Sequence, residues 1–261
     1  MKSRLLPDRW ERIVGMVDTR GGASVEEIGR TLGISVATVR RDLARIEARG
    51  LVERTRGGAT PSQNVALGPT IAESRRVNPA EKEAIGREAA RLVNDGDTLM
   101  LDGGFTTFQV ARHIASKNVS VVTKSFDVVQ ALLSKDDVSV VMVGGEFDRV
   151  SGTAVGSMTN KSLAGFSVAK AILGADAVSV EAGLCSPTPL TADTKKSMND
   201  CAHQLIVVAD HSKLGKFALY QVAALGAIDT LVTDDKADVG LLEAFREAGV
   251  EVIVASDIVE T

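Results

Sequence analysis

The stretch SVATVRRDLARIEARG, residues 35–50, decides how the N-terminal part of this chain folds. Its apolar residues recur at steps of three and four, which is the spacing of one face of an α-helix: Val36, Val39, Leu43 and Ile46. Ser35 is a favoured N-cap residue, and Gly50 suits the left-handed position that ends a helix. The stretch therefore predicts a helix that begins after Ser35 and ends at Gly50.

Two further helices are predicted upstream of this one. Residues 8–19 carry apolar side chains at helical spacing, and the glycine pair that follows ends the pattern. Ser24 and Glu27 have the form of a capping box, which predicts a short second helix closed by Gly33. Downstream, the stretch LVERTRGGAT predicts a strand that turns at Gly57 and Gly58. Three helices, a strand and a turn are typical of a winged helix-turn-helix.

Six arginines and no lysine lie in residues 40–56 of a chain whose net charge is -4. At 100° per residue, three residues lie roughly opposite the apolar stripe: Ala37, Arg41 and Arg45. Thr38 lies beside them, and Arg40 projects from the flank of the helix. An outward face that carries threonine and arginine suits insertion into a DNA major groove, with phosphate contacts from the flank. A solvated basic face is the alternative, which the helix-turn-helix spacing and the wing disfavour.

The charge of the chain is divided by region. Residues 1–60 hold 12 Lys and Arg against 8 Asp and Glu, whereas the remainder holds 18 against 26. Such a division predicts that the basic end binds a polyanion. The two cysteines are too few for a disulfide framework or a zinc site, and the first residues lack the apolar core of a secretory signal. We therefore expect a cytoplasmic protein with no membrane partner, no metal and no cofactor.

Residues 60–78 are polar, contain prolines and show little periodicity, which predicts a linker between residues 1–59 and a second domain at residues 79–261. In that second domain, short β-branched runs alternate with helical patterns, as in VSVVT, AKAILGA, LIVVAD, TLVTD and VEVIVA. This alternation predicts an α/β layer fold.

The stretch LMLDGGFTTFQVARHI, residues 99–114, is the most informative part of the second domain. A strand is predicted to end at Leu101, and a glycine turn then leads into a helix. Backbone N–H groups freed by Gly103 and Gly104, the hydroxyls of Thr106 and Thr107, and the positive end of the helix dipole predict a small anion site. A plain strand-to-helix turn is the alternative, because glycine turns are common in α/β proteins.

Both parts of the chain resemble the DeoR family of bacterial regulators of sugar metabolism. SVEEIGRTLGISVATVRRDLARIEARGLVERTRGGA, residues 24–59, is similar to the family's N-terminal domain. The order of elements after residue 79 is similar to its effector domain, which has the ribose-phosphate isomerase and glucosamine-phosphate deaminase type of fold. The resemblance implies operator contacts from Thr38, Arg40 and Arg41, with Arg56 in the wing. The predicted DNA-binding set is Ser35, Ala37, Thr38, Arg40, Arg41, Arg45 and Arg56.

The same resemblance implies a site for a phosphorylated sugar at the strand ends, in keeping with ligand binding beyond the carboxyl ends of parallel strands. The family usually has Asp-Ser-Gly-Thr-Thr-Thr at residues 102–107, and this chain departs from it at Gly103 and Phe105. Lys124 stands where asparagine is usual, and Lys213 occupies the family's Ser-Lys position. The predicted effector-binding set is Asp102, Gly103, Gly104, Phe105, Thr106, Thr107, Lys124, Ser125, Gly144, Gly145, Arg149, Asp176, Lys195 and Lys213.

Catalysis has weaker support in the sequence. Asp176 resembles a position that is catalytic in the deaminase relatives, but the histidine expected just after it is absent, and His113, His203 and His211 lack metal-ligand spacing. We therefore predict a regulator rather than an enzyme: a repressor of a carbohydrate-utilisation operon that binds double-stranded operator DNA as a homodimer or homotetramer and responds to a phosphorylated sugar. Two alternatives stay open, namely a sugar-phosphate isomerase with a DNA-binding appendage and a ligand-independent architectural DNA-binding protein.

Overall fold

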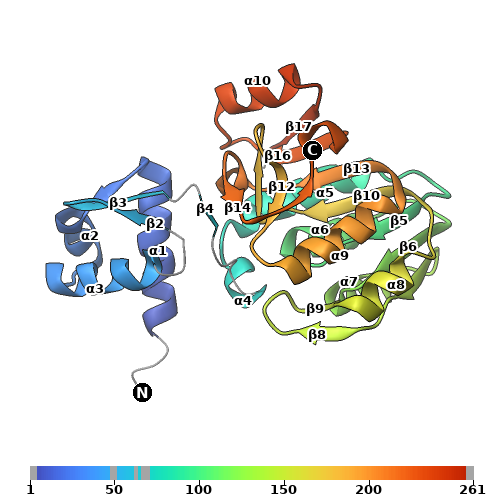
Figure 1. Ribbon diagram of the computed structural model, residues 1–261, viewed down its shortest axis with the longest axis horizontal. Helices are drawn as coiled ribbons and strands as arrows, with labels where there is room; N and C mark the ends of the chain where they lie inside the picture. Colours follow the sequence, from blue (N-terminus) through green and yellow to red (C-terminus); the bar gives the residue numbers. More distant parts are fainter. Residues whose placement is uncertain (1–4, 48–51, 62–63, 66–70, 257–261) are drawn as a thin grey trace. The chain divides into compact units, whose positions relative to one another are not determined.

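The computed structural model describes residues 5–47, 52–61, 64–65 and 71–256, and the chain divides into two compact units, residues 1–68 and 69–261 (Figure 1). The stretch predicted as a linker contributes to both units. Strand β3 (Gly58–Pro61) continues into it, strand β4 (Asn64–Val65) lies within it, and helix α4 (Ile71–Ser74) already belongs to the second unit. The remainder of that stretch, residues 62–63 and 66–70, lies outside the described residues.

The first unit is the winged helix-turn-helix that the sequence predicts. Its helices are α1 (Leu5–Arg20), α2 (Val25–Leu32) and α3 (Val36–Glu47), and strands β1 (Ala23–Ser24), β3 and β2 (Val52–Arg54) form an antiparallel sheet in the order β1-β3-β2. The predicted capping box of Ser24 and Glu27 is present, and Gly33 has a left-handed φ of 66°. Ser35 Oγ accepts a hydrogen bond from the N–H of Thr38 at 3.2 Å, so it caps α3. Gly50 lies outside the described residues.

The apolar stripes that the sequence predicts form the core of this unit. Ile13 and Val17 of α1, Ile28 of α2, and Val39 and Ile46 of α3 are all fully buried. Each helix therefore turns one face inward and leaves the other to solvent, which is the arrangement expected for helices of 3.6-residue period.

The second unit is built on a parallel sheet of seven strands in the order β17-β16-β13-β10-β5-β6-β7. Its strands are β5 (Thr98–Leu101), β6 (Val119–Thr123), β7 (Val138–Met142), β10 (Val168–Gly174), β13 (Ala202–Val208), β16 (Thr230–Asp234) and β17 (Glu251–Ala255). The chain runs outward in one direction from β5 and then returns to run outward in the other from β10. The strand order therefore reverses between β5 and β10, and this switch point is where α/β sheets of this type bind ligands.

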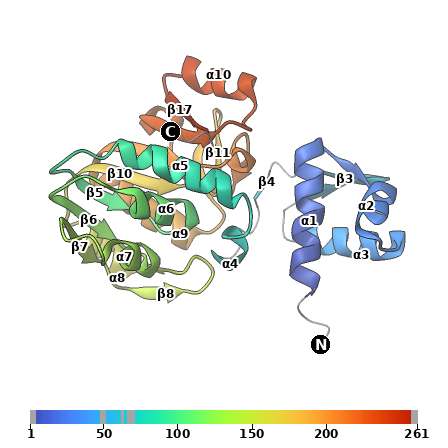
Figure 2. The same cartoon turned by 180° about the vertical axis from the view of Figure 1, so that it is seen from behind.

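Helices cover both faces of the sheet. Helices α5 (Pro79–Arg91), α6 (Phe105–His113) and α7 (Phe126–Leu132) pack on the face that carries Leu99 and Leu101. Helices α8 (Ser157–Leu163), α9 (Pro189–Asp200) and α10 (Val239–Glu247) pack on the face that carries Met100. Figure 1 shows α9 in front of the sheet, and Figure 2, from behind, shows α5. The predicted α/β layers are thus confirmed, with alternate residues of β5 entering opposite cores.

Several short elements have no counterpart in the sequence-based prediction. Strands β8 (Glu146–Asp148) and β9 (Thr153–Val155) form a hairpin, and β11 (Ala177–Ser179), β12 (Gly183–Ser186) and β15 (Tyr220–Ala223) form a small antiparallel sheet. Strand β14 (Phe217–Ala218) and two 3₁₀ turns, η1 (His211–Lys213) and η2 (Leu225–Ala227), complete the unit. Segments of two to four residues are too short to show a period. Among the described helices, none is long and apolar enough to cross a membrane.

Candidate functional site

Helix α3 presents the arginines that the sequence places on its outer face. Arg40, Arg41 and Arg45 are exposed, as are Ser35 and Ala37 at its start. Thr38 is half-buried, and its hydroxyl lies 2.9 Å from that of Ser35. Arg56 is exposed in the turn between β2 and β3, which makes it the predicted wing residue of the set.

One charged side chain of α3 points the other way. Asp42 is 1% exposed, its Oδ2 accepts a hydrogen bond from Nε of Arg9 at 2.7 Å, and Nη2 of the same guanidinium lies 2.7 Å from that oxygen. This ion pair ties α3 to α1 and fixes the rotation of α3 about its axis. Because residues 40 and 41 directly precede Asp42, a fixed rotation determines where their guanidinium groups project.

The second unit has a pocket at the carboxyl ends of β5, β10 and β13, at the switch point of the sheet. Its cavity volume is about 80 Å³. Eight of the predicted effector-binding residues line it: Gly103, Gly104, Phe105, Thr106, Thr107, Asp176, Lys195 and Lys213. The residues that the prediction missed are Ser74, Lys82, Gly174, Ala175, Val208, Ala209 and Asp210.

The start of α6 forms one wall of the pocket. Gly104 is the N-cap with a φ of 121°, a conformation that side chains rarely adopt, and no side chain caps the helix. The Thr107 hydroxyl donates to the Gly104 carbonyl at 3.0 Å. The N–H groups of the first turn are therefore left for an anion.

Gly103 has a packing reason of its own. A Cβ at Gly103 would lie 2.1 Å from Cγ2 of Thr153, which belongs to strand β9. A serine, which the DeoR pattern usually has at this position, would not fit unless Thr153 moved. Strand β9 of the β8–β9 hairpin packs against the glycine turn. This close packing explains why this chain has glycine at position 103, where the family usually has serine.

Lys213 is the cation of the pocket that is best placed for a ligand. It ends η1, and in the described part of the chain its ammonium takes part in no hydrogen bond or ion pair. Asp210 caps the turn by accepting from the Ser212 N–H at 3.1 Å, and His211 donates its N–H to Asp234 at 2.7 Å. The turn is thus held on both sides while the Lys213 side chain is available to an anion.

Lys195, from α9, is by contrast fully engaged. Its Nζ donates to the Gly174 carbonyl at 2.7 Å and to Asp176 Oδ2 at 3.1 Å, and it lies 3.7 Å from Asp102 Oδ2. Burial acts to lower the pKa of Lys195, but the carboxylates of Asp176 and Asp102 outweigh it and raise that pKa above its ordinary value. Lys195 therefore stays charged and holds Asp176 in place.

Asp176 brings a carboxylate into the pocket. Its Oδ2 accepts hydrogen bonds from Ser186 Oγ at 2.7 Å and from Lys195, whereas its Oδ1 has no hydrogen-bond partner in the described part of the chain. Burial acts to raise the pKa of Asp176, but the Lys195 ammonium and the Ser186 hydrogen bond lower it below the ordinary value. The carboxylate is thus ionised, with one oxygen able to accept a hydrogen bond from a ligand hydroxyl.

Lys82, the fourth residue of α5, is a cation of the pocket that sequence reasoning missed. It is 2% exposed, and its Nζ donates to the carbonyls of Ser74 and Val77, each at 2.7 Å, and lies 3.7 Å from Asp210 Oδ2. Burial lowers the pKa of Lys82 to about 8. In the sequence this lysine lies among charged residues at the start of a helix, where a solvated side chain is the usual expectation.

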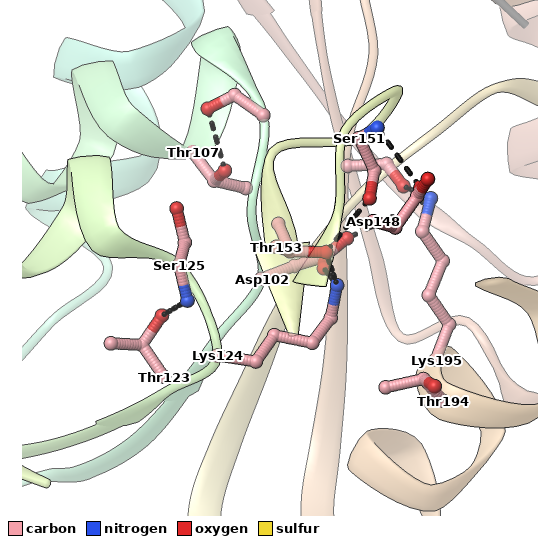
Figure 3. A network of polar contacts seen from close by, with 12 residues as sticks. Asp102, Thr107, Thr123, Lys124, Ser125, Asp148, Ser151, Thr153, Thr194 and Lys195 are labelled. Atoms are coloured by element: carbon pink, nitrogen blue, oxygen red, sulfur yellow. Dashed lines mark hydrogen bonds and ion pairs between the residues drawn. The ribbon is translucent and has the colours of Figure 1, made fainter. Parts of the chain in front are cut away.

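The remaining predicted effector residues lie outside the pocket lining. Figure 3 shows Lys124 reaching Asp102 and Thr153, with Nζ 3.0 Å from Asp102 Oδ1 and 3.0 Å from Thr153 Oγ1. Asp102 is 1% exposed, so it lies between Lys124 and Lys195 beneath the pocket. Ser125 is buried, and its N–H donates to the Thr123 hydroxyl at 3.1 Å. Asp102 therefore connects Lys124 with Lys195 of the pocket lining.

The last three predicted residues lie around the β8–β9 hairpin. The Gly144 carbonyl accepts from the Thr159 hydroxyl at 3.1 Å, and a Cβ at Gly145 would lie 1.9 Å from that same hydroxyl oxygen. Arg149 is exposed in the hairpin turn. The structure therefore does not bring them to the pocket. No group of histidine, cysteine or carboxylate side chains within the described ranges has the arrangement of a metal site.

Two family models match the chain, one in each unit. Residues 9–64 match the DeoR-like helix-turn-helix domain, and residues 77–235 match the DeoR C-terminal sensor domain. The second match alone covers more than half of the chain and contains the pocket, apart from Ser74.

Three named relatives match most of the chain. The transcriptional regulator GlpR of Haloferax volcanii is 34% identical over 95% of this chain and 98% of its own. The transcriptional repressor AccR of Agrobacterium fabrum is 33% identical over 87% and 89%. The transcriptional repressor GlcR of Bacillus subtilis is 32% identical over 94% and 95%. Each is named as a regulator of transcription, which agrees with the predicted regulator and not with the isomerase alternative.

Among solved structures, ribose 5-phosphate isomerase A of Methanocaldococcus jannaschii is similar over 51% of this chain and 53% of its own, with 21% identity and a TM-score of 0.37. That likeness is too distant to carry an argument about this chain. The family matches and the relatives suffice: the chain belongs to the DeoR family of transcriptional regulators, with a DNA-binding helix-turn-helix unit and a C-terminal sensor unit.

Proposed function

We propose that this regulator represses a carbohydrate-utilisation operon in the cytoplasm, and that a phosphorylated sugar bound in the pocket sets its affinity for the operator. The observation that carries the effector class is the convergence of three anion-binding features at the switch point: the uncapped start of α6, the Thr106 hydroxyl and the Lys213 ammonium. The names of the relatives AccR and GlcR support repression as the direction of control.

The pocket suits the two ends of such a ligand. A phosphate group would take the N–H groups that follow Gly104 and the charge of Lys213, which is a pairing of dianion with helix dipole and ammonium. The free Oδ1 of Asp176 would accept a hydrogen bond from a sugar hydroxyl. A ligand with a phosphate at one end and hydroxyls at the other therefore matches the polar groups that line the pocket.

The predicted DNA-binding set is the proposed operator contact. Its arginines lie on the exposed side of α3 and in the wing turn, where phosphate and base-edge contacts both suit a guanidinium group. We propose further that the regulator acts as a homodimer or homotetramer, because one winged domain offers few base contacts and repeated half-sites multiply them.

A thermal-shift screen of the full-length protein tests the effector class. A ligand that binds only the folded state adds RT ln(1 + [L]/Kd) to the free energy of unfolding, which is ~2.7 kcal/mol at a hundredfold excess over Kd. Sugar phosphates should raise the melting temperature, and the same sugars without phosphate should not. The variant Thr106→Ala with Lys213→Ala should lose the shift. A full shift in that variant would place the ligand elsewhere, and a flat response to every sugar phosphate would reject the effector class.

A further inference from the structure

The segment that precedes α5 is anchored at the pocket. Residues 73–78, which we term the tether, comprise the last two residues of α4 and the segment that leads from α4 to α5, and through α4 the chain continues back to the DNA-binding unit. Ser74 of the tether lines the pocket itself. A ligand that contacts Ser74 therefore contacts the segment through which the sensor unit is connected, along the chain, to the DNA-binding unit.

Lys82 is the main anchor of the tether. Its ammonium donates to the carbonyls of Ser74 and Val77, each at 2.7 Å, and makes a longer hydrogen bond to Ser74 Oγ at 3.4 Å. Its third neighbour is Asp210, whose Oδ2 lies 3.7 Å away and thus beyond hydrogen-bond distance. Lys82 and Asp210 both line the pocket, so this ammonium lies beside the space that a ligand would occupy.

Two further contacts hold the tether. Asn78, in a left-handed conformation with a φ of 52°, donates from Nδ2 to Asp210 Oδ1 at 2.8 Å. Arg75 forms an ion pair with Asp127 at 2.6 Å, and its guanidinium lies 5.9 Å from the centre of the Phe108 ring. Asp210 therefore receives Asn78 from the tether on one oxygen and faces Lys82 with the other, which couples both anchors to one pocket residue.

The charges around Lys82 define what it would bind. Burial lowers its pKa, Asp210 raises it, and the neighbouring Lys213 ammonium lowers it further. Lys82 and Lys213 thus repel one another, the Asp210 carboxylate offsets part of that repulsion, and an anion bound beside both ammonium groups reduces it further. A phosphate group supplies the anion, and its charged oxygens are stronger acceptors for Lys82 than the Ser74 hydroxyl at 3.4 Å.

We propose that Lys82 is a second anion-binding residue of the effector pocket, and that a phosphate group bound there tightens the hold of Lys82 on the carbonyls of the tether. This inference rests on the proposed sugar-phosphate site and adds its regulation: occupancy of the pocket changes how firmly the tether is fixed to the sensor unit. The ligand acts through its different affinity for the loose and the fixed tether, as any allosteric coupling requires.

Hydrogen–deuterium exchange of the full-length protein tests this with inorganic phosphate as the probe, against chloride at the same ionic strength. Phosphate should slow exchange in peptides that cover residues 103–107 and residues 73–78, the latter by about fivefold, the lower end of typical coupling. Protection of residues 103–107 without any change at residues 73–78 would overturn the inference and leave the proposed site standing. No protection in either peptide would reject the proposed site and the inference with it.

Two variants assign the effect to Lys82. Lys82→Met should speed exchange of the tether without phosphate and remove its response to phosphate, whereas the peptide over residues 103–107 should keep part of its protection through Lys213. Lys135→Met is the matched control, because Lys135 also donates to a backbone carbonyl, that of Ile114 at 2.7 Å, but does not line the pocket. An unchanged tether response in Lys82→Met would overturn the role of this residue. The wild-type measurement decides by itself if Lys82→Met does not fold.

Discussion

The direction of the arginines on α3 follows from a single buried residue. Asp42 is fixed to Arg9, and successive residues of a helix are 100° apart, so Arg41 and Arg40 lie 100° and 200° away from the one charged side chain that faces the core. Neither can turn inward without breaking the buried ion pair. A hydrogen bond to a base edge depends on the position of the donor, so a base contact requires guanidinium groups whose placement is fixed.

Arg41→Ala should abolish specific operator binding and leave the fold intact, because an exposed arginine on this face suits a bidentate contact worth ~1–3 kcal/mol. Arg40→Ala, on the flank, should weaken binding more uniformly across DNA sequences. Mobility-shift titrations at one fixed salt concentration measure both. Arg91→Ala is the control, because Arg91 is an exposed arginine of the sensor unit that pairs with Glu88. Unchanged affinity in Arg41→Ala would mean that a different face of α3 meets the DNA.

At the scale of elements, the 3₁₀ turn η1 carries Lys213, and a histidine holds that turn. His211 Nδ1 lies 2.8 Å from Asp234 Oδ1. The hydrogen bond to Asp234 raises the pKa of His211 above 6.5, against burial, with Asp210 and Glu81 adding to the rise. Glu81 is itself paired with Lys236. Because the folded pKa is raised, the protonated imidazole stabilises the fold below pH 6.5, and this contribution is lost as the pH rises through the folded value.

His211→Gln should therefore lower the melting temperature more near pH 6 than near pH 9. The expected difference is about 1 kcal/mol, or about 2–4 °C for a unit of this size, since the imidazole is partly exposed and its ion pair partly screened. Asp234 stays ionised over this range, because its pKa is lowered by His211 even though burial raises it. His203→Gln is the control, because His203 is exposed on β13. Equal losses at both pH values would show that the charged form of His211 adds no stability.

The sequence predicts elements with a clear period and the residues directly attached to them. The helices of the first unit and the strands of the large sheet are of this kind, and so is the glycine turn after β5, because strand ends and helix starts are local signals. Lys82 and Asp210 could not be predicted as pocket residues. They are 128 positions apart in the sequence. They come together only in the folded chain, where the tether covers the start of α5 and Lys82 lies beside Asp210. The β8–β9 hairpin could not be predicted because each of its strands is only three residues long, which is too short to show a period.

At the scale of the whole molecule, the distribution of charge along the chain follows the separation between the DNA-binding unit and the sensor unit. The basic first sixty residues belong to the DNA-binding unit, and the acidic remainder forms the sensor unit around a pocket with its own local cations. An acidic sensor unit is repelled by the phosphate backbone, so electrostatics favours contact with DNA through the first unit alone. One such unit reads few base pairs, which makes repetition the means of reaching operator specificity.

The protein should therefore be an oligomer that binds paired half-sites. Light scattering at micromolar concentration should give a multiple of the 27.4 kDa chain mass. Operator DNA that keeps both half-sites on one side of the helix should bind best, because two units joined through one assembly reach both sites together. Inserting about 5 base pairs between them, half of a ~10 base-pair turn, should lower affinity toward that of a single half-site. A mass of 27.4 kDa with and without DNA, together with equal affinity for the two spacings, would leave each chain binding alone and would require a single winged domain to supply all of the specificity.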